Sequence, residues 1–106
     1  MAKYLIAASY TAEGLRGLAK DKASGRKKAV EKALASVGGK LDAVYYALGK
    51  WDVFVIADFP DNLAAASMAV AVSSTGLVRT QTTPLFTVAE ADHLFDKAVA
   101  YRAPGA

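Results

Sequence analysis

Apolar and polar positions divide the chain into short extended segments that alternate with helical ones. Two runs, Tyr4–Ala8 and Val53–Ala57, are apolar at consecutive positions. Short continuous runs of this kind, bounded by turn residues, are typical of strands that are buried on both faces. Pro84 limits the last part of a fourth strand to an edge or a bulge. The pattern predicts four strands, at residues 3–10, 40–48, 53–59 and 77–86.

Helical patterns fill the intervals between these strands. Thr11 can cap a helix that begins at Ala12, and the glycine and polar residues of the Lys20–Gly25 stretch predict a break in it. A stronger helical period then runs to Gly38-Gly39, which stops it. Asp61 can cap a helix to about Ser73 that has almost no polar face, so we expect that helix to be buried or to meet another subunit.

A last helix is predicted near the end of the sequence. Thr87 and Glu90 have the spacing of a capping box, in which each side chain accepts a hydrogen bond from the other residue's backbone amide. Residues 102–106 are expected to form a frayed tail. The apolar face of the helix is supplied by Val88, Ala91, Leu94, Phe95, Ala98 and Val99.

The order of elements predicts one α+β domain over residues 1–106. Strand, helix, strand, strand, helix, strand is the ferredoxin-like plan, here with an extra C-terminal helix. Right-handed crossovers place both internal helices on one face of a four-stranded antiparallel sheet. Alternation turns Phe54, Ile56 and Asp58 toward the other, open face. Since the apolar runs indicate burial on both faces, we expect a second copy of the chain there, in a homodimer or a higher even oligomer.

Composition limits the kinds of site and the cell compartment that the sequence allows. The chain has 106 residues, 54% of them hydrophobic, a net charge of +3 and no cysteine. Absence of cysteine excludes disulfides and thiolate metal sites and favours a reducing cytoplasm. No apolar stretch is long enough for a secretion signal or a membrane span, so no membrane partner is expected. The basic residues between Lys20 and Lys32 have no interleaved aromatic residue and are interpreted as a solvated helix face, not a nucleic-acid site.

No motif commits the chain to a reaction. Phosphate-binding glycine loops and the Gly-x-Ser-x-Gly nucleophile elbow are absent, and no cofactor is expected. His93, between Asp92 and Asp96, is expected to face solvent, and this cluster offers too few ligands for a metal.

A candidate pocket is predicted on the open face of the sheet. The first and third strands are expected to run parallel, which would place Tyr10 and Asp58 at one end of the sheet, where Arg79 enters. Tyr45 and Tyr46 point to opposite faces, so only one of them can serve the pocket. Alternatively, Asp58 and Arg79 form a structural ion pair. The predicted ligand-binding residues are Tyr10, Tyr46, Phe54, Asp58 and Arg79, which combine apolar walls with few polar groups.

Three short motifs follow one another along the chain: Gly49-Lys50-Trp51-Asp52, the strand Val53–Phe59 with Pro60-Asp61, and the segment Gly76–Thr82. Together they resemble the GYD-domain family of small bacterial proteins. Trp51 replaces the tyrosine that gives the family its name. The resemblance implies a dimeric α+β barrel, in which two sheets pair by their open faces. Gly49, Trp51 and Asp52 are interpreted as structural, because an aromatic residue and an aspartate can fix the base of a hairpin.

Three functions stay open at this point. The first is a module, with a regulatory role, that binds a small molecule between the open sheet faces of a dimer. The second is a cofactor-free oxygenase or isomerase that uses Asp58, a tyrosine or His93 for proton transfer. The third is a structural interaction protein. Fold similarity alone does not choose among them.

Overall fold

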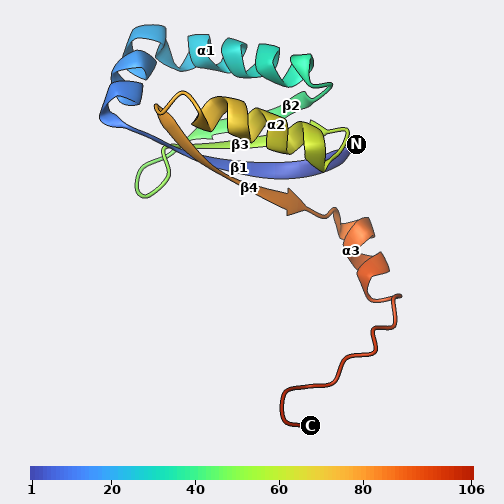
Figure 1. The fold of residues 1–106 in the computed structure, drawn as a ribbon. Coiled ribbons are helices and arrows are strands. Elements are labelled where there is room, and N and C mark those ends of the chain that lie inside the picture. The colour runs from blue at the N-terminus through green and yellow to red at the C-terminus, as the bar shows by residue number, and fades with distance from the viewer.

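The protein is an α+β structure in which two helices cover one face of a four-stranded sheet (Figure 1). The computed structural model describes residues 1–106. In chain order the elements are β1 (Ala2–Tyr10), α1 (Ala12–Ser36), β2 (Lys40–Tyr46), β3 (Val53–Phe59), α2 (Asn62–Ser73), β4 (Val78–Leu85) and α3 (Val88–Leu94). The strands have the order β2-β3-β1-β4 and pair antiparallel throughout, as in ferredoxin-like folds.

The direction of β1 corrects one expectation. β1 runs antiparallel to β3, with Lys3 opposite Asp58 and Ala8 opposite Val53, so the prediction that these two strands are parallel is wrong. The reason lies in the connections. α1 carries the chain back across the sheet, so β2 has the same direction as β1, and the hairpin then reverses β3. As a result, Tyr10 and Asp58 lie toward opposite ends of the sheet.

The predicted break in the first helix is confirmed. α1 is bent at Lys22, whose φ of 63° and ψ of 166° are not helical. Thr11 caps the helix by accepting a hydrogen bond from the Gly14 amide at 3.1 Å. Beyond the bend, Leu34 reaches the core and is fully buried.

The second helix also begins as predicted. Asp61 caps α2 through a 2.8 Å hydrogen bond from the Ala64 amide. Only Ala65 and Met68 of α2 are buried, whereas Leu63 and Val70 stay exposed on its outer side. The outer side of α2 is therefore apolar as well, and no other element of this chain covers it.

The last helix is shorter than its apolar pattern suggested. The Thr87–Glu90 capping box is present, but α3 ends at Leu94, before Phe95 and Val99 of the predicted apolar face. None of its residues is buried. A helix of this length gains little stability from its own hydrogen bonds and depends on packing, which its own chain does not provide.

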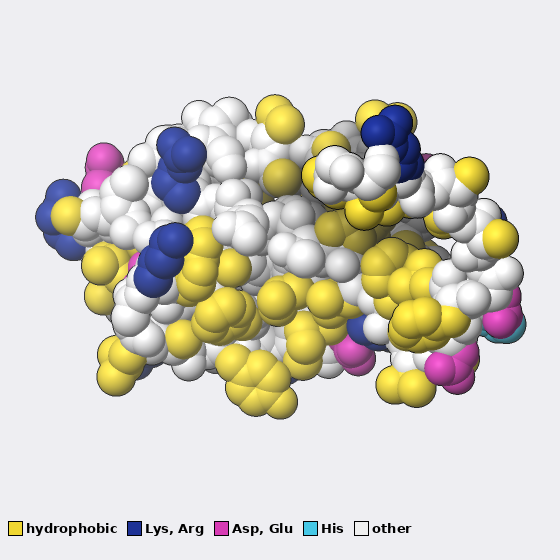
Figure 2. All heavy atoms as spheres, turned by 90° about the horizontal axis from the view of Figure 1, so that it is seen from below, with side chains coloured by type: hydrophobic (Ala, Val, Ile, Leu, Met, Phe, Trp, Pro, Cys, Tyr) yellow, Lys and Arg dark blue, Asp and Glu magenta, His cyan; other side chains and the backbone are white.

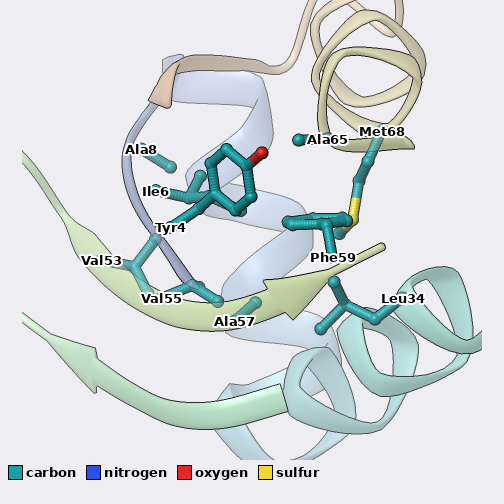
Figure 3. Packing of buried hydrophobic residues seen from close by; sticks show 10 residues of the cluster. All are labelled: Tyr4, Ile6, Ala8, Leu34, Val53, Val55, Ala57, Phe59, Ala65 and Met68. Atoms are coloured by element: carbon teal, nitrogen blue, oxygen red, sulfur yellow. The ribbon is translucent and has the colours of Figure 1, made fainter. Parts of the chain in front are cut away.

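The core lies between the sheet and the two covering helices (Figure 3). Val53, Val55 and Ala57 are buried and face the helices, as predicted. The rings of Tyr4 and Phe59 meet edge to face, with 5.4 Å between their centroids, and the Tyr4 hydroxyl donates to the Asn62 side chain. The cluster consists of Tyr4, Ile6, Ala8, Leu34, Val53, Val55, Ala57, Phe59, Ala65 and Met68.

The C-terminal part of the chain leaves this packed body. We call residues 86–106 the C-terminal arm; it includes α3 and runs away from the two layers, below the sheet in the view of Figure 1. The radius of gyration is 16.7 Å, against roughly 13 Å for a compact chain of this length. The arm accounts for the elongated shape, whose longest extent is 55 Å. None of the helices is both long enough and apolar enough to cross a membrane.

Candidate functional site

The hairpin between β2 and β3 is fastened to the end of β1. Gly49 has a φ of +119°, a conformation that glycine adopts without steric cost. The Asp52 carboxylate accepts a 2.8 Å hydrogen bond from the Tyr10 amide, and the Asp52 amide donates to the Ala8 carbonyl, also at 2.8 Å. The Lys50 amine lies 5.4 Å from the centre of the Trp51 ring. These contacts give the Gly49–Asp52 motif a positioning role in the fold.

The open face of the sheet has an apolar centre. Leu5 and Ala7 of β1 lie opposite Ile56 and Phe54 of β3. Tyr45 of β2 pairs with Phe54 and keeps 67% of its surface exposed. Seen from this side, hydrophobic side chains spread across the molecule with few charged ones among them (Figure 2). We call Leu5, Ala7, Tyr45, Phe54 and Ile56 the open-face patch.

A charged cluster closes one end of this patch. The Lys3 amine lies 2.8 Å from Asp42 Oδ2 and 3.1 Å from Asp58 Oδ1. Asp42 is the extra residue of a bulge in β2, where the register shifts between Leu41 and Ala43. Hydrogen bonds to Asp42 and then to Asp58 raise the pKa of Lys3 above the usual lysine value. The cluster therefore carries two carboxylates for one ammonium group.

Uncharged and basic groups line the β4 edge of the same face. Arg79 lies opposite Ser9, and Gln81 and Thr83 follow on β4 opposite Ala7 and Leu5. Asp58 lies opposite Lys3 and Arg79 opposite Ser9, six residue steps further along β1, which is roughly 20 Å at the spacing of a strand. Asp58 pairs with Lys3 and not with Arg79, so the predicted ion pair between Asp58 and Arg79 does not form within the chain.

The five predicted ligand residues are divided between the two faces. Phe54 and Asp58 lie on the open face, as strand alternation predicted, and Arg79 lies there too, opposite Ser9. Tyr10 and Tyr46 instead line a cavity on the helix side, together with Val30 of α1. One chain therefore does not bring the five residues together. On the open face the aromatic residue of β2 is Tyr45.

The helix-side pair of tyrosines has its own electrostatic environment. Burial raises the pKa of the Tyr46 hydroxyl, and the neighbouring Tyr10 raises it further, while Arg26 lowers it. Desolvation disfavours the charged phenolate. Tyr46 is therefore a neutral hydrogen-bond donor over a wide pH range.

Two residues of the open face were missed from the sequence. Lys3 and Asp42 join Asp58 there, although neither belongs to the predicted site. The period-two pattern Lys3, Leu5, Ala7, Ser9 carried the signal for Lys3, because these positions share one face of a strand. No sequence signal locates Asp42, since its position depends on the bulge.

His93 lies outside both faces. Its side chain is 79% exposed, and its Nδ1 is 3.3 Å from Asp96 Oδ2. No group of three or more histidine, aspartate or glutamate side chains is arranged to hold a metal ion. The helix thus presents a surface pair, with no further ligand beside it.

Comparison with protein families matches the GYD domain over residues 4–95, which covers β1 from Tyr4 onward, the other three strands and both helices of the packed body. Searches of the curated proteins and of the solved structures found no match. The matched range contains the Gly49–Asp52 hairpin motif, the open-face patch, and Asp42 and Asp58 of the charged cluster, whereas Lys3 lies just before it. The chain belongs to the GYD-domain family.

Proposed function

We propose that the protein binds a small, partly apolar molecule as a homodimer, with the ligand held between two open sheet faces, and that binding serves regulation. The observation that carries this proposal is the open-face patch. Phe54 and Ile56 lie in the middle of a sheet face that no element of the chain covers. Sheets that face water alternate apolar and polar residues and keep the outer face polar.

The size of the face explains why a second contact is needed. Four strands of about seven residues give a flat footprint of roughly 19 by 23 Å, or about 440 Å². A stable interface covers about 800 Å² of each partner. Pairing of the open faces alone therefore buries less area than a stable interface needs, even though side chains make the true surface larger than the flat footprint. Additional surface must come from elsewhere in the chain.

The C-terminal arm supplies such a surface. It follows β4 directly after Leu85 and extends on the side of the sheet away from the helices (Figure 1). A second copy stacked on the open face would lie beside this arm. Its exposed hydrophobic side chains are Phe86, Val88, Leu94, Phe95, Val99 and Tyr101.

Polar groups at the margins of the patch suit a ligand better than a dry interface. Arg79, Gln81 and Thr83 present hydrogen-bonding groups along one edge, and the Lys3 cluster does so at one end. Small-molecule sites are mainly apolar and orient the ligand with a few polar groups. Paired faces would offer this combination twice, once from each copy.

Proton-transfer chemistry finds less support. Asp58 is held by the Lys3 amine at 3.1 Å, and Tyr10 lies on the helix side of the sheet. Proton transfer needs the acid and base groups within hydrogen-bond reach of one substrate, whereas one chain places Asp58 and Tyr10 on opposite faces of the sheet. Ligand binding without turnover is therefore the function we propose.

The assembly is tested with a charge placed in the patch. Ile56→Lys would bury a lysine in the paired faces, and we expect this variant to be monomeric in light scattering, whereas the unmodified chain is dimeric. Leu15→Lys is the matched control, because Leu15 is 46% exposed on α1, away from the open face. It should stay dimeric. A dimeric Ile56→Lys protein, or a monomeric unmodified chain, would refute the proposal.

A further inference from the structure

Two neighbouring cavities lie on the helix side of the sheet, opposite the open-face patch. The smaller, about 60 Å³, reaches between the helices and the sheet and is mostly apolar, with Val30 and Met68 in its wall. The larger, about 160 Å³, lies under the first half of α1 beside Gly17 and Leu77. Tyr10, Arg26 and Val78 line both. The two cavities therefore meet at these three side chains.

We propose that this double cavity is a binding site for a small organic carboxylate, whose apolar part enters between helices and sheet and whose carboxylate meets the Arg26 guanidinium. The site goes beyond the proposed function. Every residue in it comes from one chain, so it does not depend on the dimer.

The volume limits the ligand to about one ring. An engineered apolar cavity of about 150 Å³ in another protein takes up benzene. The larger cavity, at about 160 Å³, is comparable. The smaller cavity adds room for a short extension beside Val30. A monocyclic or short aliphatic acid fits, whereas a nucleotide or a large cofactor does not.

Polar groups at the junction of the two cavities favour a negatively charged ligand. Arg26 makes no hydrogen bond within the chain, and its nearest acid, Asp21, is 3.9 Å away, beyond hydrogen-bond distance. Lys27 adds a second positive charge beside the smaller cavity. An arginine with free donors binds a carboxylate through two parallel hydrogen bonds. Asp21, the single acidic side chain of the lining, would be displaced as the ligand's competitor.

The two tyrosines complete the junction. Both Tyr10 and Tyr46 line the smaller cavity, and neither hydroxyl has a hydrogen-bond partner in the chain. A neutral phenol can donate to a carboxylate oxygen, so the pair adds donors next to Arg26.

The bend in α1 gives the site a means of opening. Lys22, between Asp21 and Arg26, has a left-handed φ of 63° that a lysine rarely adopts. Strained residues of this kind often occur at ligand clamps and hinges. Rotation at Lys22 would move the half of α1 that carries Gly17 away from the half that carries Arg26, and the larger cavity lies between them.

The test is a titration followed by nuclear magnetic resonance of the backbone amides, with sodium benzoate as the probe and benzyl alcohol as its neutral counterpart. Benzoate should shift the amides of Tyr10, Arg26 and Val78, and benzyl alcohol should bind at least about tenfold more weakly. Arg26→Gln should weaken the binding of benzoate by a similar factor. Arg16→Gln removes the same charge from an exposed site on the same helix, and it should leave the affinity for benzoate unchanged.

A second variant tests the volume. An added Cβ at Gly17 meets nothing within 4 Å, so Gly17→Leu is compatible with folding, and its side chain would occupy the edge of the larger cavity. Gly17→Leu should weaken the binding of both benzoate and benzyl alcohol. Equal binding of benzoate and benzyl alcohol, benzoate affinity unchanged in Arg26→Gln, or shifts confined to the open face would each overturn the proposal. The last result would still be compatible with the proposed dimer, so the two proposals fail separately.

Discussion

Gly14 and Gly17 lie on the same half of α1, yet alanine should affect them in opposite directions. A Cβ added at Gly14 would lie 2.3 Å from the Leu77 carbonyl oxygen and 3.2 Å from the Leu77 carbonyl carbon. That oxygen already accepts the Thr11 amide at 2.9 Å, so it cannot move without loosening the contact between α1 and β4. At Gly17 the added Cβ meets nothing within 4 Å.

The magnitude follows from competing terms. Alanine gains about 1 kcal/mol over glycine inside a helix. At Gly14, overpacking costs about 1 to 3 kcal/mol, and loss of the Thr11 hydrogen bond costs about 1 kcal/mol. Gly14→Ala should therefore destabilise the protein by about 1 to 3 kcal/mol. Gly17→Ala should stabilise it by up to about 1 kcal/mol.

Urea denaturation followed by circular dichroism measures both changes as free energies of unfolding. Thermal melting provides a second reading, at roughly 4 to 8 °C for each kcal/mol in a domain of this size. Gly14→Ala protein that is as stable as the unmodified chain would refute the close approach of α1 to Leu77. Destabilisation by Gly17→Ala would refute the assignment of open space beside it.

Three further predictions concern single contacts. Asp52→Ala removes the acceptor of the Tyr10 amide and should lower the free energy of unfolding in urea by about 1 to 3 kcal/mol; an unchanged value would contradict the hairpin contact. The Glu90 carboxylate accepts a hydrogen bond from the Thr87 backbone amide, and the Thr87 hydroxyl accepts one from the Glu90 amide, which completes the capping box. The bond to the carboxylate lowers the pKa of Glu90. The contribution of Glu90 to the stability of α3 should therefore be complete above the usual glutamate pKa and disappear as pH falls through the lowered value. The Thr87 amide resonance should follow this titration, and a shift centred at or above the usual glutamate pKa would contradict it. Because the pKa of Lys3 is raised, its ion pairs should stabilise the fold fully below the usual lysine pKa and be lost as pH rises through the raised value. The difference in unfolding free energy between the unmodified chain and Lys3→Met should therefore vanish at alkaline pH. A difference that persists there would contradict the ion pairs of Lys3.

Local signals in the sequence predicted most of the fold. The caps at Thr11, Asp61 and Thr87 depend on side chains within three residues, so a short window of sequence contains the whole interaction. The facing of Val53 and Val55 follows from strand alternation in the same way.

Features that depend on distant partners were less accessible. The relative direction of β1 and β3 depends on the path of α1. The prediction that these strands run parallel was wrong, and it placed Tyr10 and Asp58 at the same end of the sheet. The bulge at Asp42 changes which residues of β2 share a face, and neither charge nor periodicity marks it. α3 ends early because no other element of the chain packs on Phe95 and Val99, which both stay exposed. The candidate site was therefore predicted in its residue types and only partly in its arrangement.

Native mass spectrometry of the purified protein, first under gentle and then under activating conditions, tests the proposed dimer most directly. We expect a species of twice the mass of one chain that carries a small molecule and releases it on activation before the subunits separate. A species with the mass of one chain under gentle conditions would contradict the pairing of open sheet faces and the ligand site between them.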